Sequence, residues 1–365
     1  MNSTKSTVRV SDNTLENAYY RVEINPVNGN ISRFYDKVND REVFADGQEG
    51  NILQFLGDKY SRKDAWDIKY DGREWQCDSV ASIQIIENGP VRGVLRVERI
   101  FQNSSFTQDY TIYQGIPRLD IKTSADWHEH HILLKAVFPV DVHTEEANYD
   151  IAYGTLQRPT HPRTKAEKAK WEVAAHMFVD LSQPDYGVSL LNNCKYGYDI
   201  HDNRIRITLL RSPKTPQPIE LPPDYEQPYA DMGHHEFTYS LYPHSGDYVA
   251  ANTKQKAYEL NYHLLANLTD THKGSLPSEH SFVTVNADNV MVCSVKKAED
   301  SDNSIIRLFE TLGHPANVAL ALDTPIAKAW TINMIEDRQE SLPVDDGKIS
   351  FSLKPYEIYT VEVQK

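Results

Sequence analysis

Long stretches of this chain alternate apolar and polar residues with a period of two. Examples are residues 94–101 (VLRVERIF), 106–113 (FTQDYTIY) and 119–122 (LDIK), with short breaks at 103–105 and 115–117. Because successive side chains of a strand point to opposite faces, this period is typical of strands with one face in a core and one in water. The pattern predicts an antiparallel β-meander and an all-β fold.

Residues 19–25 and 31–35 form a similar pair, separated by Asn28-Gly29-Asn30. An Asn-Gly dipeptide between two apolar-polar runs is typical of a β-hairpin turn, so a hairpin is predicted here. Two other segments contain many helix-forming residues. Residues 164–170 (TKAEKAK) lack an apolar face and are predicted to be a surface loop leading into a strand at 171–179, whereas 255–265 is predicted to be a short helix.

The polar segment 271–279 (THKGSLPSE) contains Gly and Pro and separates a long first region from a compact tail. Further alternating runs in the tail are 281–285, 290–296, 305–310, 318–322 and 357–363. These features predict two domains, a large β-domain over residues 1–270 and a small β-sandwich over 271–365.

The composition is that of a globular protein of 365 residues, with 40% hydrophobic and 25% charged residues. The net charge of −14 argues against nucleic acid and anionic membranes as partners, because both select basic surfaces. Three widely spaced cysteines cannot build a disulfide framework or a Cys-x-x-Cys metal site. With no apolar signal segment at the start and no run of eighteen apolar residues, a cytoplasmic location is expected.

Residues 126–131 (DWHEHH) are the strongest candidate for a metal site. If this segment were a strand, His128 and His130 would point to one face, and zinc would need further ligands from elsewhere in the chain. The alternative is an ordinary polar sandwich face. His161 lies in a proline-bracketed loop, which could hold its side chain in place or could simply be a structural turn. The segment 64–67 (DAWD) also leaves two interpretations open. Trp66 beside carboxylates suits a sugar, or it belongs to the core with solvated neighbours.

The segment 193–199 (NCKYGYD) crowds aromatic, small and charged residues between two strand-like runs. Such segments are typical of sugar-binding loops, where rings and hydrogen-bonding groups converge. Tyr196 and Tyr198 could equally fill the edge of a sandwich. No Gly-x-Ser-x-Gly elbow and no phosphate-binding glycine loop is present.

An ordered series of short motifs runs from about residue 14 to the end of the chain. In order, they are 15–24 (LENAYYRVEI), 29–37 (GNISRFYDK), 64–67, 126–129, 134–139 (LKAVFP), 153–154, 158–161 (RPTH), 175–176, 180–182 (DLS), 193–199, 210–213 (LRSP) and 235–239 (HEFTY). This series resembles the C-terminal β-region of the α-mannosidases of glycoside hydrolase family 38, in the cytosolic and bacterial branch.

The resemblance implies a galactose-mutarotase-like supersandwich followed by a small β-sandwich. It also implies a longer parent enzyme with an N-terminal catalytic α/β domain and a helical bundle, in which zinc and a carboxylate nucleophile remove terminal α-linked mannose with retention. Nothing in this sequence resembles that catalytic domain. We therefore expect a C-terminal portion that is inactive alone, with no catalytic residue and no metal ligand of its own.

In the family, loops of the β-region close over the catalytic pocket. That contact is carried over here to substrate-binding residues Lys195, Tyr196, Gly197, Tyr198 and Asp199, with Gly197 allowing close backbone approach. The implied partners are the absent N-terminal domains and an α-mannoside, and assembly into a homo-oligomer stays open. Two rivals remain: an autonomous carbohydrate-binding module, or a mutarotase-like sugar enzyme that uses His128, His130 or His161 as acid or base.

Overall fold

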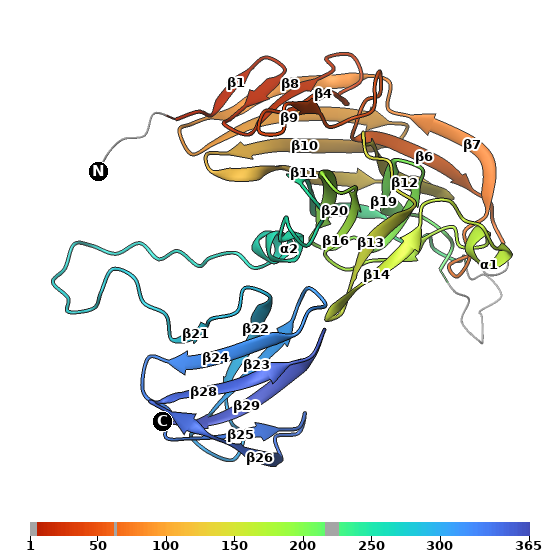
Figure 1. Cartoon of the computed structure of the whole chain (residues 1–365). Helices are drawn as coiled ribbons and strands as arrows, with labels where there is room; N and C mark the ends of the chain where they lie inside the picture. Colours follow the sequence, from red (N-terminus) through yellow and green to blue (C-terminus); the bar gives the residue numbers. More distant parts are fainter. Residues whose placement is uncertain (1–5, 62–63, 216–225) are drawn as a thin grey trace. The chain divides into compact units, whose positions relative to one another are not determined.

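The computed structural model describes residues 6–61, 64–215 and 226–365, and the chain divides into two compact units (Figure 1). Unit 1 comprises Met1–Asp150 and Leu156–His263, and unit 2 comprises Ile151–Thr155 and Leu264–Lys365. The domain boundary predicted between residues 270 and 271 lies in the segment after α2 (Thr253–Asn261), which has neither helix nor strand until residue 283.

Three antiparallel sheets build unit 1. The largest has nine strands, in the order β14 (Gly154–Pro159), β13 (Glu146–Ile151), β16 (Phe178–Ser182), β17 (Tyr186–Asn192), β20 (Gly233–Ser245), β11 (Ile116–Trp127), β10 (Ser104–Tyr113), β9 (Arg92–Phe101) and β8 (Val80–Asn88). The six-stranded sheet has the order β15 (Val173–Ala174), β18 (Gly197–His201), β19 (Arg204–Arg211), β12 (Ile132–Pro139), β6 (Ile52–Asp58) and β7 (Tyr70–Gln76). The five-stranded sheet is β1 (Arg9–Ser11), β2 (Thr14–Glu16), β3 (Tyr20–Ile24), β4 (Ile31–Asp36) and β5 (Arg41–Glu42).

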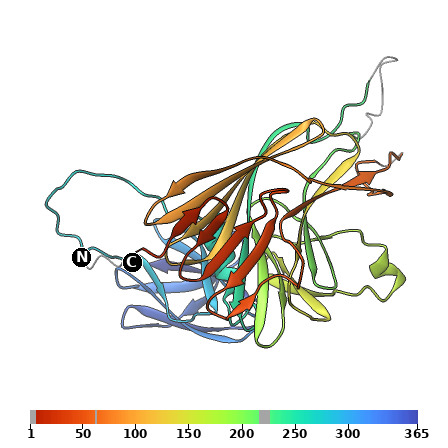
Figure 2. The ribbon, with the colours of Figure 1, turned by 90° about the horizontal axis from the view of Figure 1, so that it is seen from above.

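One apolar core joins these sheets. Phe55 of the six-stranded sheet stacks on Phe101 of the nine-stranded sheet, with ring centroids 3.6 Å apart, and also faces the fully buried Trp127. The small red sheet in Figure 2 packs its first two strands on β8, β9 and β10. Alternate side chains therefore meet in a common interior, as the period of two requires, and the all-β sandwich prediction is confirmed for unit 1.

The predicted hairpin is confirmed, since β3 pairs with β4 and Gly29 adopts a φ of +75° in the turn. The carboxylate of Glu49 closes the turn by accepting hydrogen bonds from the side-chain amides of Asn25, Asn28 and Asn30 at 2.6, 2.8 and 2.9 Å. Partial burial favours the neutral acid, but the three amide donors outweigh it and hold the pKa of Glu49 below its usual value.

The predictions for residues 164–179 are wrong in two respects. Residues 165–168 form the one-turn helix α1 (Lys165–Lys168), because the side chains of Thr164 and Glu167 cap each other's backbone N–H groups. The single strand expected at 171–179 is divided between β15 and β16, which belong to different sheets. The short helix predicted over 255–265 is present as α2, which packs its apolar face on β16 and β17. It ends at Asn261, so the prediction is wrong for Leu264 and Leu265, which lie beyond the helix and are exposed.

Unit 2 is a sandwich of two antiparallel sheets around its own core. The four-stranded sheet has the order β21 (Val283–Val285), β24 (Ala316–Leu322), β28 (Lys348–Leu353) and β27 (Val344–Asp345). The five-stranded sheet has the order β22 (Val290–Lys297), β23 (Ser304–Glu310), β29 (Ile358–Gln364), β25 (Lys328–Ile332) and β26 (Arg338–Leu342). All five alternating runs of the tail are strands here, whereas β25 to β28 were not predicted from the sequence.

Candidate functional site

The turn between β17 and β18 is organised by the side-chain amide of Asn192. Its Oδ1 accepts a hydrogen bond from the backbone N–H of Lys195 at 2.7 Å, and its Nδ2 donates to the hydroxyl of Tyr198 at 2.5 Å. The neighbouring Asn193 exchanges two hydrogen bonds with the backbone of Thr238 in β20, at 2.9 and 3.1 Å. The turn is therefore held against the strand that carries the HEFTY motif.

Lys195 and Tyr196 are the members of the predicted set that this turn presents to solvent. The Lys195 ammonium lies 4.5 Å from the ring centroid of Phe237, and partial burial lowers its pKa. The Asp231 carboxylate acts on this ammonium at longer range, but among the described residues no carboxylate forms an ion pair with it, so its N–H donors are available to a ligand. Tyr196 is 55% exposed and packs edge-on to the His176 ring.

The other three predicted residues belong to strand β18 rather than to a loop, so the predicted loop is wrong from Gly197 onward. A Cβ on Gly197 would lie 3.0 Å from a carboxylate oxygen of Glu172, so the glycine makes room for that side chain. Tyr198 is fully buried, and its hydroxyl accepts the hydrogen bond from Asn192, so its ring is not presented to solvent as that of Tyr196 is. Its burial agrees with the rival interpretation, in which it fills the sandwich.

Asp199 is buried among cations on the polar side of the six-stranded sheet. Its carboxylate pairs with the Lys135 ammonium at 2.7 Å and with the Arg206 guanidinium at 2.5 Å. Lys135 is itself almost fully buried and also pairs with Glu172. Loss of this carboxylate would leave a buried cation without its partner, which is the costly case for a buried ion pair.

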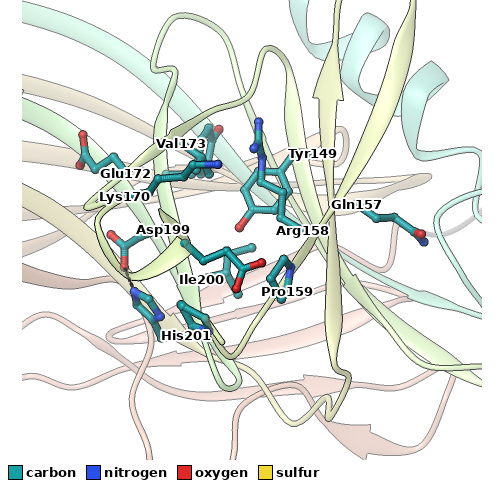
Figure 3. A pocket seen from close by; sticks show the side chains of 13 residues that line it. Tyr149, Gln157, Arg158, Pro159, Lys170, Glu172, Val173, Asp199, Ile200 and His201 are labelled. Carbon is teal, nitrogen blue, oxygen red and sulfur yellow. Dashed lines mark ion pairs between the residues drawn. The ribbon is translucent and has the colours of Figure 1, made fainter. Parts of the chain in front are cut away.

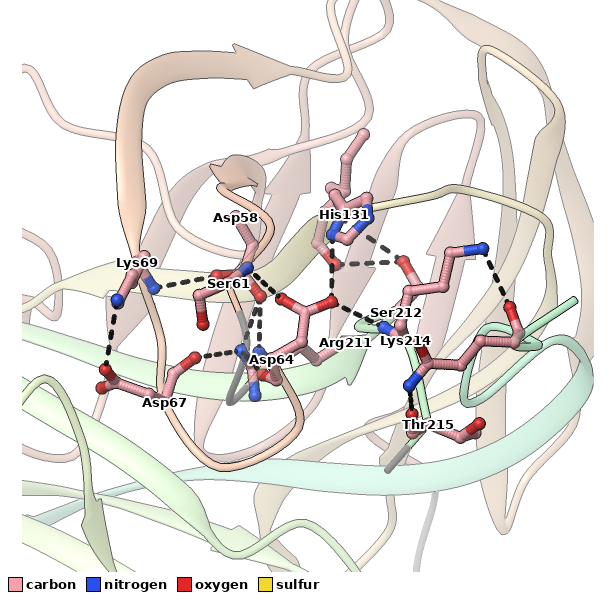
Figure 4. A network of polar contacts seen from close by, with 12 residues as sticks. Asp58, Ser61, Asp64, Asp67, Lys69, His131, Arg211, Ser212, Lys214 and Thr215 are labelled. Atoms are coloured by element: carbon pink, nitrogen blue, oxygen red, sulfur yellow. Dashed lines mark hydrogen bonds and ion pairs between the residues drawn. The ribbon is translucent and has the colours of Figure 1, made fainter. Parts of the chain in front are cut away.

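Three of the sequence motifs meet at a second polar cluster, which joins Asp64, His131 and Arg211 (Figure 4). The Asp64 carboxylate accepts a hydrogen bond from the backbone N–H of Lys214 at 2.8 Å and lies 3.4 Å from Nδ1 of His131. The Arg211 guanidinium pairs with Asp58 at 2.7 Å and donates to the backbone carbonyl of Asp64 at 2.8 Å. These contacts hold the loop after β6 against β12 and β19.

In the DAWD segment, the interpretation that placed Trp66 in the core with solvated acidic neighbours is wrong. Asp64 is buried, whereas Trp66 is 81% exposed, because the segment forms a turn rather than an extended strand. Trp66 thus remains free to contact another molecule. The charged cluster beneath it positions the loop.

The three candidate histidines do not converge on one point. Strand β11 ends at Trp127, and beyond it Nε2 of His128 lies 2.9 Å from Asp126 while His130 stacks on Tyr229 with centroids 3.8 Å apart. Within residues 6–61, 64–215 and 226–365, no group of three or more His, Cys, Asp or Glu side chains could hold a metal ion. His161 is elsewhere, paired with Asp202 at 2.5 Å. The donors present do not fit a zinc site.

Of the residues that the structure describes, none lies in a helix with the length and apolar character needed to cross a membrane. Cys77, Cys194 and Cys293 are free thiols.

Two family models match the chain. The model described as the glycosyl hydrolases family 38 C-terminal domain matches residues 15–219, and the family 38 C-terminal beta sandwich domain matches residues 289–361. Alpha-mannosidase G of Dictyostelium discoideum is 32% identical over 360 residues, which cover 96% of this chain and 32% of that protein. Alpha-mannosidase 2C1 of Homo sapiens is 32% identical over 357 residues, covering 95% of this chain and 33% of that protein.

An alpha-mannosidase from Enterococcus faecalis V583 has the same fold over 99% of this chain and 43% of its own, with a TM-score of 0.81 at 19% identity. The chain spans about a third of the length of the two curated relatives.

Proposed function

Because the chain belongs to glycoside hydrolase family 38, whose C-terminal domain model matches more than half of it, we propose that it is the β-region of a zinc-dependent, retaining α-mannosidase. In this role it performs no chemistry itself. It completes the substrate pocket of a longer enzyme that removes terminal α-linked mannose, and it is inactive alone.

The observation that supports this role most directly is the state of Lys195. This half-buried ammonium is held over an aromatic ring, and its donors are unused by the described residues. Beside it, the exposed ring of Tyr196 offers an apolar face. Hydroxyl groups and the carbon face of a mannose match these two groups, so we assign them to the wall of the pocket.

The remaining parts of the proposal concern the longer enzyme. In this proposal the metal, the nucleophile and the acid/base belong to an N-terminal catalytic α/β domain, which packs with a helical bundle against this β-region. The proposal agrees with the lack of a metal-binding group among the described residues. A cytoplasmic location suits three free thiols, because reducing compartments keep cysteines unpaired.

The decisive experiment compares this chain with an enzyme that carries the same β-region behind a family 38 catalytic domain. With zinc present, the longer enzyme should hydrolyse an aryl α-mannoside and the chain alone should not. Turnover by the chain alone would refute the proposal.

Within the longer enzyme, Lys195→Met keeps the apolar stem and removes the donors. We expect a loss of at least about tenfold in kcat/KM, the value of one charge-assisted hydrogen bond. Lys256→Met is the matched control, because Lys256 is a surface residue paired with Glu259 at 3.0 Å. Equal effects of the two changes would exclude Lys195 from the pocket.

A further inference from the structure

A pocket of about 210 Å³ opens between β13, β14, β18 and the segment from α1 to β15 (Figure 3). Most of its side chains carry hydrogen-bonding groups. They include Tyr149, Arg158, Glu167, Lys170, Asp199 and His201.

Arg158 is the unusual member of this set. Its guanidinium lies over the ring of Tyr149, with Cζ 5.4 Å from the centroid, and its Nε is buried without a hydrogen-bond partner. In the described part of the chain, no hydrogen bond or ion pair engages its terminal nitrogens either. By contrast, Arg206 and Arg211 are both paired with buried carboxylates. A buried donor without a partner is costly, and a bound ligand would satisfy it.

The carboxylates that border the pocket are committed to other groups. Asp199 is paired with Lys135 and Arg206, and Glu172 is paired with Lys135. One oxygen of Glu167 accepts two backbone N–H groups at the start of α1. These pairings leave the positive charge of Arg158 unopposed while the carboxylates keep lone pairs that can accept hydrogen bonds from hydroxyl groups.

Tyr149 completes the set of donors. Its side chain is buried, and no hydrogen bond of its hydroxyl is formed within the described residues. Burial, with the nearby Asp199 charge, raises the pKa of this phenol, so the hydroxyl keeps its proton at neutral pH.

We propose that this pocket binds an acidic monosaccharide, a small polyol that carries one carboxylate or phosphate group. The fork of Arg158 binds the anionic group through two parallel hydrogen bonds, and Tyr149 donates a further one. Sugar hydroxyls donate to the free lone pairs of Asp199 and Glu167. The site does not depend on the proposed α-mannosidase role, since all of its residues lie in this chain.

Titration calorimetry on the 365-residue chain tests the site with four probes: glucuronate, glucose 6-phosphate, glucose and inorganic phosphate. At least one of the two acidic sugars should bind about tenfold or more tightly than glucose, because only an anion engages both arms of the guanidinium. It should also bind more tightly than inorganic phosphate, which has no sugar hydroxyls. Glucose or phosphate binding as tightly as both acidic sugars, or no binding of either acidic sugar, would overturn the proposal.

Arg158→Gln should lower the affinity for the acidic sugar by about tenfold or more. Arg158→Lys should lower it by an intermediate amount, because lysine keeps the charge but lacks the two parallel N–H donors of the guanidinium. Arg163→Gln is the matched control, since Arg163 carries the same charge nearby, pairs with Glu145 and does not line the pocket. That variant should change the affinity by no more than about twofold, as expected for an exposed charge. An equal loss in the control, or an unchanged affinity in Arg158→Gln, would show that Arg158 does not hold the anion. Because Arg158 makes no ion pair to lose, its variants should remain folded.

Discussion

Replacing Asp199 by Asn tests whether this carboxylate supports the fold of unit 1. The change keeps the size of the side chain and removes its charge. The amide oxygen of the new Asn can still accept a hydrogen bond from Lys135 or Arg206. Its NH₂ group must then face the other cation, to which it offers no acceptor. Lys135 is almost fully buried, so its ammonium cannot recover the lost interaction from water.

The size of the effect follows from how many partners remain. Removing one member of a buried ion pair costs about 3–5 kcal/mol. Lys135 keeps Glu172, and the Arg206 side chain is 25% exposed and can be partly hydrated. We therefore expect the lower end of that range, about 3 kcal/mol of unfolding free energy.

The assay is guanidinium chloride unfolding followed by tryptophan fluorescence in a Trp330→Phe background. Trp330 lies in unit 2, whereas the remaining tryptophans, including the buried Trp127, lie in unit 1, so the signal reports on unit 1 alone. Asp202→Asn is the matched control, because Asp202 is exposed and its ion pair is with the exposed His161. If Asp199→Asn costs no more than this control, Asp199 is not held by buried ion pairs and the reasoning fails.

Three further predictions use the same chain. The lowered pKa of Glu49 means that its carboxylate stabilises the fold above the unfolded-state pKa of about 4.3 and that this contribution is lost as the pH falls through the folded-state value. In denaturant unfolding, the wild type should therefore have a larger free energy of unfolding than Glu49→Gln at pH 7, and the difference should shrink below about pH 4. A difference that stays constant with pH would contradict the assignment. Ellman's reagent at pH 8 should modify the exposed Cys194 before Cys77, because burial shields the Cys77 thiol and raises its pKa to about 11. Cys194→Ser should remove a fast phase and Cys77→Ser should not; loss of the fast phase in Cys77→Ser instead would contradict the burial of Cys77. Gly29→Ala should cost more than about 1 kcal/mol in the same unfolding assay, because φ is +75° and the new Cβ would lie 2.8 Å from a side-chain carbon of β9; Gly47→Ala has a similar φ in open space, so an equal cost in both variants would mean that backbone strain acts without the clash.

The sequence by itself determined the local elements of this protein. A period of two specifies which residues can share one face of a strand, so the meander of β9, β10 and β11 and the five tail strands followed from it. The Asn-Gly turn specified the first hairpin for an equally local reason, since few residues other than glycine accept a positive φ. The order of motifs along the chain also identified the family.

Only the tertiary structure decided which of these faces are covered. Tyr196 and Tyr198 are equivalent in the sequence pattern, yet one is exposed and the other is buried, because β18 pairs with β19 and places Tyr198 in the core. Asp199 is neutralised by Lys135, which lies 64 residues away in the chain.

The division of residues 171–179 between two sheets has the same cause, because strand pairing depends on partners far away in the chain. Alternation of residue types carries no information about these long-range neighbours. Burial and charge pairing are set where distant segments pack together. Lys195 and Arg158 are half-buried and form no ion pair with the described residues, so they could be recognised as binding groups only in the folded molecule.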